Sequence, residues 1–83
     1  MAYNVTLKKQ ALKYITKLAK PTAARIYNAI EAIKEAPTIG ELLTNHTAQY
    51  KYRVGNYRIL YDVFENELCI DIIKIGPRGD VYN

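Results

Sequence analysis

The sequence has no tryptophan, a single cysteine, and no apolar run of about 18 residues, the length that a membrane-spanning helix needs. Cys69 cannot form a disulfide within the chain, and in its apolar stretch we expect it to act as a small buried side chain. The segment Met1–Thr6 lacks a basic region followed by an apolar stretch, so it does not predict a secretory signal. These absences favour a cytoplasmic protein without a membrane partner.

The chain is also too short for more than one core. It has 83 residues, of which 49% are apolar and 24% are charged, as in ordinary folded domains. We therefore expect residues 1–83 to form a single domain. Because the core of so small a domain is thin, one sheet covered on one face by helices is the favoured arrangement.

Acidic residues are missing from the first twenty positions. That segment carries five lysines: Lys8, Lys9, Lys13, Lys17 and Lys20. The net charge is +4 and the pI is about 9.2, which suggests a polyanionic partner without proving one. The aromatic set is eight tyrosines and one phenylalanine, and tyrosine serves both in half-buried strands and as a stacking surface for bases.

The spacing of apolar residues predicts a strand and two helices in the first half of the chain. Tyr3–Leu7 alternates between apolar and polar residues, as a half-buried strand does. Lys8–Ala19 places apolar residues at helical spacing, opposite a stripe of lysines. A second helix is expected from Pro21 to about Glu35, because proline suits the first helical turn and Pro37 ends the pattern. The short break between the two helices predicts an antiparallel helical hairpin.

The second half of the chain predicts a loop and three strands. Thr38–Ala48 has no clear period, so we expect a loop with one helical turn around Glu41–Leu43. The strands are expected at Tyr50–Val54, Tyr57–Val63 and Leu68–Ile75. The predicted fold class is therefore a two-layer α+β domain, in which the N-terminal strand and the helical hairpin pack on one face of a three- to four-stranded, mostly antiparallel sheet.

The dipeptide Gly55-Asn56 predicts a two-residue turn, and such a turn fixes how the flanking strands pair. Counting outward, Arg53 faces Arg58 and Lys51 faces Leu60. One face of the hairpin is then apolar or aromatic and suits a cover of helices; it carries Tyr50, Tyr52, Val54, Tyr57, Ile59 and Tyr61. The other face carries Lys51, Arg53, Arg58 and Leu60.

Two arginines directly opposite each other destabilise a sheet, by about 0.2 to 1 kcal/mol on the scale of cross-strand pairs. An anionic ligand would turn this repulsion into a binding site. The simpler interpretation stays open, because basic residues are common on exposed sheet faces and Asp62 lies further along the same face. A bulge in the hairpin would also scatter the cluster. Arg78 follows in a glycine-rich loop, where the backbone can approach a ligand or simply turn.

The runs Tyr52–Tyr61 and Lys74–Tyr82 together resemble the RelE branch of the RelE/ParE toxin superfamily. The Lys20-Pro21 break before the second helix is similar too, so the resemblance covers essentially the whole chain, and the family fold has the element order expected above. It implies the toxin of a type II toxin–antitoxin system that enters the ribosomal A site and cuts mRNA with no metal or other cofactor. The 2′-hydroxyl would attack the adjacent phosphate and leave a cyclic phosphate and a free 5′-hydroxyl. The implied partners are a RelB-like antitoxin, the ribosome with its mRNA, and operator DNA through the antitoxin complex.

Matched position by position, the resemblance implies five catalytic residues: Lys51, Arg53, Arg58, Arg78 and Tyr82. Guanidinium groups match phosphate oxygens, so Arg58 and Arg78 are expected to stabilise the phosphate under attack. Lys51 is the expected general base, because neighbouring positive charges lower its pKa. Tyr82 is expected to stack on a base or to orient the phosphate. Arg53 stands where relatives often have lysine, and arginine is a poor proton acceptor.

Other polar residues have weaker claims. Lys9, Lys13 and Lys17 are candidates for RNA binding through phosphate contacts, although a solvated helix face explains them equally well. His46 is expected to be solvated surface. Three functions stay open: a ribosome-dependent mRNA endonuclease, which the residues favour; a ParE-like inhibitor of DNA gyrase; and a non-catalytic homologue that acts only as co-repressor with its antitoxin.

Overall fold

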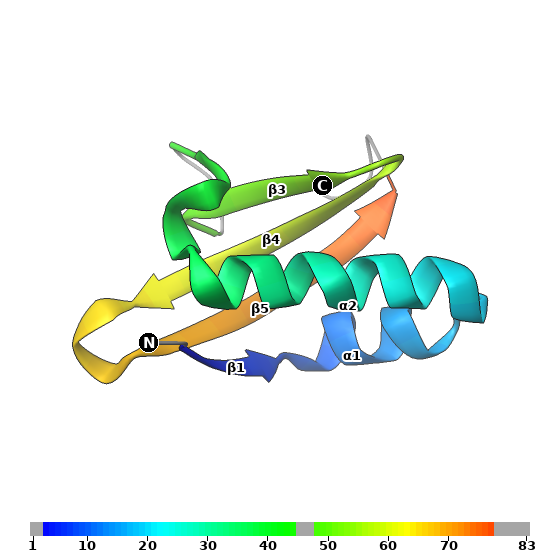
Figure 1. Cartoon of the computed structure of the whole chain (residues 1–83), viewed down its shortest axis with the longest axis horizontal. Coiled ribbons are helices and arrows are strands. Elements are labelled where there is room, and N and C mark those ends of the chain that lie inside the picture. The colour runs from blue at the N-terminus through cyan, green and yellow to red at the C-terminus, as the bar shows by residue number, and fades with distance from the viewer. Residues whose placement is uncertain (1–2, 45–47, 78–83) are drawn as a thin grey trace.

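The computed structural model describes residues 3–44 and 48–77. The helical elements are α1 (Lys9–Thr16), α2 (Lys20–Glu35) and the 3-10 turns η1 (Pro37–Ile39) and η2 (Glu65–Glu67). The strands are β1 (Asn4–Leu7), β2 (Glu41–Leu42), β3 (Tyr50–Val54), β4 (Tyr57–Phe64) and β5 (Cys69–Pro77) (Figure 1). Within these ranges no helix is long and apolar enough to cross a membrane.

All five strands form one sheet in the order β1-β5-β4-β3-β2. β1 runs parallel to β5, and the other neighbours are antiparallel. The predicted α+β class with a mostly antiparallel sheet is confirmed, but the predicted count of three to four strands is wrong. The helical turn expected around Glu41–Leu43 is also wrong, because Glu41 and Leu42 pair with Lys51 and Tyr50 as a fifth strand. A strand of two residues is too short to show the alternation by which strands are recognised.

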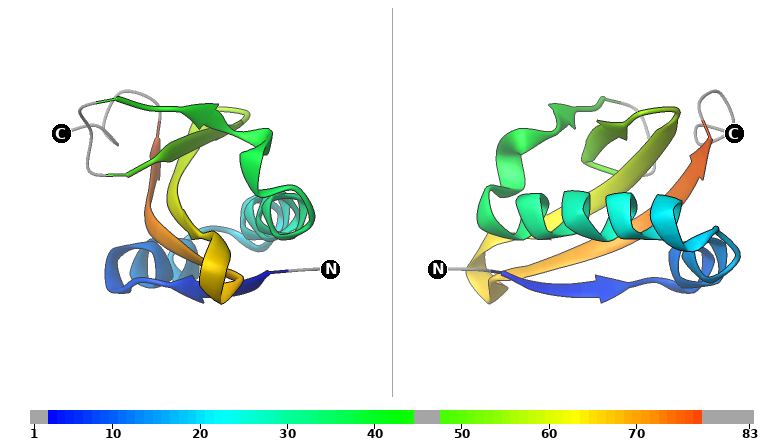
Figure 2. Two further views of the ribbon diagram at one scale, coloured as in Figure 1. Left: turned by 90° about the vertical axis from the view of Figure 1, so that its left-hand side faces the viewer. Right: turned by 45° about the vertical axis from the view of Figure 1, so that its right-hand side comes forward.

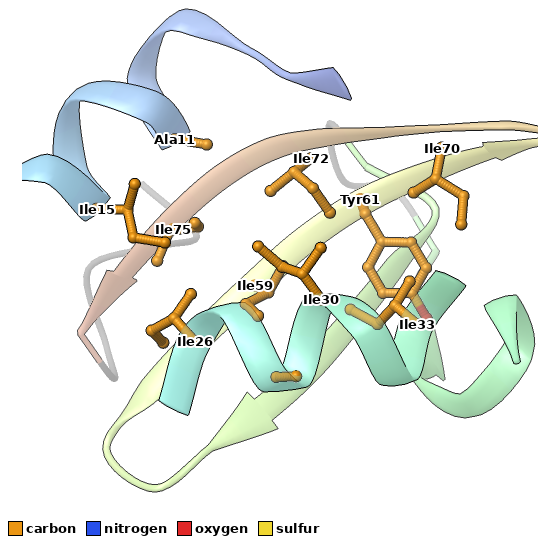
Figure 3. Close-up of a cluster of buried hydrophobic side chains, with 11 residues drawn as sticks. Ala11, Ile15, Ile26, Ile30, Ile33, Ile59, Tyr61, Ile70, Ile72 and Ile75 are labelled. Atoms are coloured by element: carbon orange, nitrogen blue, oxygen red, sulfur yellow. The ribbon is translucent and has the colours of Figure 1, made fainter. Parts of the chain in front are cut away.

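One long helix covers the middle of the sheet. α2 crosses β4 and β5 (Figure 1) and buries its apolar stripe of Ile26, Ile30 and Ile33 against them. Figure 3 shows the side chains that meet it from the strands: Ile59, Tyr61, Ile70, Ile72 and Ile75. Each isoleucine removed from water in this way contributes about 1.5–3 kcal/mol. The aromatic face predicted for the hairpin is therefore the one that the helices cover.

The first helix closes the edge of the sheet beside β5. β1 pairs with β5 only as far as Leu7 and Ile72, and the chain then turns into α1 (Figure 2). Beyond that point the Gln10 side chain takes the place of a strand, because its amide donates to the Ile75 carbonyl (3.1 Å) and accepts from the Ile75 N–H (3.0 Å). Ala11 and Ile15 of α1 are buried in the same core as α2.

The hairpin β3–β4 has the predicted register. Arg53 lies opposite Arg58, Lys51 lies opposite Leu60, and Gly55 takes the positive φ (56°) that its tight turn requires. A Cβ atom at Gly55 would come within 2.5 Å of the Arg25 guanidinium, so α2 packs closely over the turn. The register shift considered for this hairpin does not occur there. It occurs in the next strand pair, where β4 and β5 change register between Leu60 and Tyr61.

Candidate functional site

The face of the sheet away from α2 carries a row of cations from neighbouring strands. β3 supplies Lys51 and Arg53, and β4 supplies Arg58 directly opposite Arg53. The three residues alternate with the core residues of their strands, so the pleat places all of them on the face that α2 leaves uncovered. The sequence prediction that these three cations share a face is thus confirmed, although their chemical roles are a separate question.

Arg58 is the most deeply placed of these cations. Its side chain is only 5% exposed, and its Nη1 donates to the carbonyl of Tyr57 at 3.3 Å. None of the ion pairs among residues 3–44 and 48–77 includes Arg58. A guanidinium taken out of water without a carboxylate beside it is costly, and an anion that supplies acceptor oxygens offsets that cost. The burial of Arg58 therefore favours the anion site over an ordinary solvated face.

Lys51 is held by an acidic residue that the sequence prediction did not include. Glu41 lies opposite Lys51 in the β2–β3 pair, and its carboxylate is 3.3 Å from the Lys51 ammonium. Asp62, which was considered as the neutralising acid, instead accepts the backbone N–H of Gln49 at 2.8 Å. Glu41 could have been found only by predicting β2, because the pairing of that two-residue strand brings it to Lys51. A nearby carboxylate favours the charged ammonium, which opposes the effect of the neighbouring arginines.

A shallow pocket of about 400 Å³ opens beside Lys51 and Arg53, where β2 begins. It is lined by Ile39, Gly40, Glu41, Lys51, Tyr52 and Arg53. A second pocket of similar size, about 410 Å³, lies against β3 and the end of β4 and includes no basic side chain; it is lined by Leu42, Gln49, Tyr50, Val63, Glu65 and Asn66. The first pocket is therefore the one whose charge suits an anionic ligand.

Tyr61 holds the wall of the basic pocket in place from within the core. Its buried hydroxyl donates to the Pro37 carbonyl (2.8 Å) and accepts the Gly40 N–H (3.0 Å), and its ring stacks on Tyr50 at 5.2 Å. Burial raises the pKa of Tyr61 to about 12, so the hydroxyl stays protonated and can donate. A Cβ at Gly40 would lie 2.6 Å from this hydroxyl and 2.7 Å from the Lys51 carbonyl, so a side chain there would push β2 away.

β5 adds a fourth cation that the sequence prediction did not assign to the site. Lys74 pairs with Leu60, and Leu60 pairs with Lys51, so the three residues form one row across β3, β4 and β5. Gly76 pairs with Arg58 in the next row and adds no side chain there. Only the register of β5 could have shown this, because plain alternation from Ile70 and Ile72 would turn Lys74 toward the core.

The remaining predicted site residues are not brought to this face by the described structure. Arg78, Tyr82 and His46 lie outside the described residues. The candidate RNA-binding lysines on α1 and at its C-terminal end, Lys9, Lys13 and Lys17, are exposed. However, α1 lies along the edge of β5, two strands away from β3. Among residues 3–44 and 48–77, no cluster of histidine, cysteine, aspartate or glutamate is suited to hold a metal ion.

Comparisons with known proteins agree with this fold. The family model of the ParE toxin of the type II toxin–antitoxin system parDE matches residues 5–82. A RelE-like toxin protein of Escherichia coli is 27% identical over 88 residues, an alignment that covers 100% of this chain and 93% of the relative. The toxin RelE1 of Methanocaldococcus jannaschii is 29% identical over 87 residues, covering 99% of this chain and 97% of the relative.

Solved structures show the same architecture. The RelE–RelB complex from Pyrococcus horikoshii OT3 contains a chain with a TM-score of 0.78 and 28% identity, covering 98% of this chain and 100% of that one. The isolated E. coli RelE toxin has a TM-score of 0.81 and 26% identity, covering 98% and 92%. A chain of the RelBE2 toxin–antitoxin complex from Mycobacterium tuberculosis has a TM-score of 0.83 at 22% identity, covering 94% and 100%, which shows the fold alone.

The fold and these relatives together define a small α+β toxin of the RelE/ParE superfamily. The chain belongs to the family of ParE toxins of type II toxin–antitoxin systems, and the full-length RelE relatives confirm the resemblance predicted from its motifs.

Proposed function

We propose that this toxin is a ribosome-dependent mRNA endonuclease that cleaves the A-site codon and thereby inhibits translation. The observation that carries the proposal is Arg58, a buried guanidinium that faces Arg53 across the hairpin and has no acidic partner among the described residues. The guanidinium groups of Arg58 and Arg53 suit a phosphodiester, because their forked N–H groups match its oxygens. The RelE relatives over the whole length of the chain support the same choice.

In the proposed reaction the 2′-hydroxyl of one nucleotide attacks the adjacent phosphate and the 5′-oxygen of the next nucleotide leaves. The products are a 2′,3′-cyclic phosphate and a free 5′-hydroxyl, and no metal or other cofactor takes part. Negative charge gathers on the phosphate oxygens in the transition state, and Arg58 already lies on the sheet face where it would stabilise that charge. Arg53 is proposed to bind the same phosphate rather than to carry a proton.

Lys51 is proposed as the general base that takes the proton of the 2′-hydroxyl. Glu41 qualifies this role, because the 3.3 Å ion pair favours the ammonium form that cannot accept a proton. For the free amine to form, the positive charge of the neighbouring arginines must therefore outweigh that of the Glu41 carboxylate. Arg78 and Tyr82 are proposed from the sequence resemblance as a further phosphate ligand and a stacking residue. Pro77, the residue before Arg78, pairs with Tyr57 next to Arg58.

The proposed partners follow from the same assignment. A RelB-like antitoxin would neutralise the toxin, as the names of the RelE–RelB complexes among its structural relatives indicate for those proteins. Operator DNA would be bound only through that complex. Three exposed lysines on α1 and at its C-terminal end are proposed to bind ribosomal RNA through phosphate contacts: Lys9, Lys13 and Lys17. With the ribosome as its proposed target, the toxin is proposed to act in the cytoplasm.

A second candidate is favoured by one observation, the match to a family model of ParE toxins, and it is a ParE-like inhibitor of DNA gyrase. That activity is binding rather than catalysis, and it does not require a phosphate site on the sheet. We consider it the weaker candidate because it leaves the burial of Arg58 on a basic face without a purpose.

The two candidates are separated by mapping mRNA 5′ ends in a reconstituted translation reaction. Cuts within the A-site codon that disappear with Arg58→Met and with Arg78→Ala would support the endonuclease. Lys34→Met is the matched control, since Lys34 pairs with Glu31 on α2 rather than lying on the basic face, and this variant should cut like wild type. Intact mRNA together with gyrase-trapped DNA breaks would replace the proposal with the ParE-like function. Intact mRNA with no gyrase effect would leave a non-catalytic co-repressor.

A further inference from the structure

The pairing of β4 with β5 contains one irregularity. Leu60 pairs with Lys74, but the next residue of β4, Tyr61, pairs with Ile72. Ile73 is therefore an extra residue on β5, and Ile73 and Lys74 together oppose the single residue Leu60. This bulge is the only register shift between paired strands in the described part of the chain.

The bulge decides which face of the sheet Lys74 joins. Ile70, Ile72 and Ile75 are all fully buried in the core under α2. Without the extra residue, strict alternation from Ile70 and Ile72 would place Lys74 in that core and turn Ile75 outward. The bulge reverses this arrangement beyond Ile72, so Lys74 lies on the face of its partner Leu60.

That face is the basic face described above. Leu60 belongs to a small second cluster with Ala48, Leu43 and Ile73, on the side of the sheet away from α2. Diagonal neighbours on adjacent strands are about 7–8 Å apart, which is the relation of Lys74 to Arg58. A lysine side chain with four methylene groups can span most of that distance, so both cations can reach consecutive phosphates of one RNA strand.

We propose that Lys74 is a phosphate-binding residue of the RNA site and that the bulge at Ile73 exists to turn it there. The inference rests on the proposed function and extends it from the phosphate under attack to a neighbouring phosphate of the same strand. Bulges commonly occur beside active sites, where they re-aim one side chain. Gly76 pairs with Arg58 and contributes no side chain between Arg58 and Lys74.

Lys74 is proposed to act through its positive charge, and this role predicts a specific dependence of RNA binding on salt concentration. A lysine that contacts a phosphate releases a counterion when RNA binds, so its loss flattens the dependence of affinity on salt by roughly 0.7 in log–log slope for a single strand. A lysine that only packs on the sheet leaves that slope unchanged when it is replaced by methionine. Arginine at the same position keeps the charge and therefore the slope.

The experiment measures kcat/KM for cleavage of A-site mRNA on programmed ribosomes over a range of KCl concentrations. The chains compared are wild type, Lys74→Met, Lys74→Arg and Lys34→Met. Comparing each variant with Lys34→Met at the same salt cancels the effect of KCl on the ribosome itself, and a urea midpoint shows that each variant is folded. We expect Lys74→Met to lower kcat/KM about three- to tenfold at low salt and to flatten its salt slope. Lys74→Arg and Lys34→Met should behave like wild type.

The outcomes separate the two proposals. If wild type and Lys34→Met cleave and Lys74→Met matches them in both rate and slope, the inference about Lys74 is wrong, the bulge serves only the packing of Ile73 and Ile75, and the endonuclease stands. If Lys74→Arg loses as much as Lys74→Met, the role is one of shape rather than charge, and the inference is equally overturned. If wild type does not cleave, the proposed function itself fails and the inference fails with it.

Discussion

Glu41 on β2 lies directly opposite Lys51 on β3, and their charged groups are 3.3 Å apart. This relationship makes the proposed role of Lys51 testable by pH. If Lys51 is the general base, Glu41→Gln removes a charge that favours the ammonium, so the free amine forms at lower pH. The rising limb of the pH–rate profile for mRNA cleavage should move to lower pH by less than about one unit, since an exposed ion pair contributes at most about 1 kcal/mol.

Glu65→Gln is the matched control for this shift. Glu65 lies in η2, at the end of β4 remote from Arg58, so the neutral variant should keep the wild-type profile. A profile that stays in place with Glu41→Gln, or that moves to higher pH, would remove Lys51 from the role of base and leave it as a phosphate ligand.

Arg58→Met should separate activity from stability. The buried guanidinium has no acidic partner among the described residues, so its replacement by an apolar side chain of similar length removes a desolvation cost. We expect the free energy of unfolding in urea to stay the same or to rise. Cleavage of A-site mRNA should fall about 10²- to 10³-fold, as when one preorganised donor to a reacting oxyanion is lost. A variant that loses stability and activity in parallel would mean that Arg58 is structural.

The part of this face that the sequence predicts is the part that local geometry determines. Gly55-Asn56 allows one tight turn, and the turn alone sets the opposition of Arg53 to Arg58 and of Lys51 to Leu60. The helices and the α+β class follow from apolar periods that are long enough to recognise. No distant residue is needed for any of these features.

The parts that the sequence does not predict depend on contacts between distant segments. β2 is held by contacts with distant residues: the Tyr61 hydroxyl accepts the Gly40 N–H from 21 residues away, and the pairing of β2 with β3 brings Glu41 to Lys51. The bulge turns Lys74 outward and keeps Ile75 in the core, and alternation along β5 alone cannot reveal it. Two charged neighbours of the site were missed for this reason.

Tyr61→Phe should lower the free energy of unfolding, and it should also reduce how strongly that free energy falls at alkaline pH. The variant leaves the Gly40 N–H and the Pro37 carbonyl without their partner, which costs about 1–3 kcal/mol. In wild type the pKa of Tyr61 is raised from 10.0 to about 12, so the folded state holds this proton more tightly than the unfolded state. The stability that results is complete below pH 10 and is lost as pH rises toward 12.

The difference in unfolding free energy between wild type and Tyr61→Phe should therefore shrink between pH 10 and 12. Taking the difference cancels the other tyrosines and the lysines, which titrate in both proteins. A difference that stays constant over this range would show that the Tyr61 hydroxyl titrates normally. Gly40→Ala should lower stability by a comparable amount at neutral pH, because its Cβ meets the Tyr61 hydroxyl and the Lys51 carbonyl.

Gln10 should prove more important to stability than its place on a surface helix suggests. Its amide satisfies both backbone groups of Ile75 at the edge that β1 leaves open, so Gln10→Ala should cost about 1–3 kcal/mol in urea unfolding and speed hydrogen exchange at the Ile75 amide. Lys9→Ala, one residue earlier on α1 and exposed, is the control and should change stability little.

Gln10→Glu should make the stability contributed by this contact depend on pH, in a direction that the hydrogen bonds determine. The carboxylate can accept the Ile75 N–H but faces the Ile75 carbonyl without a proton to donate, so the pKa of the new carboxyl should lie above that of the unfolded chain. Its folded form gains a donor as the carboxyl becomes protonated, so the deficit relative to wild type should be largest at neutral pH and shrink as pH falls through this pKa. A deficit that is independent of pH would show that only the acceptor half of the Gln10 contact stabilises the sheet edge.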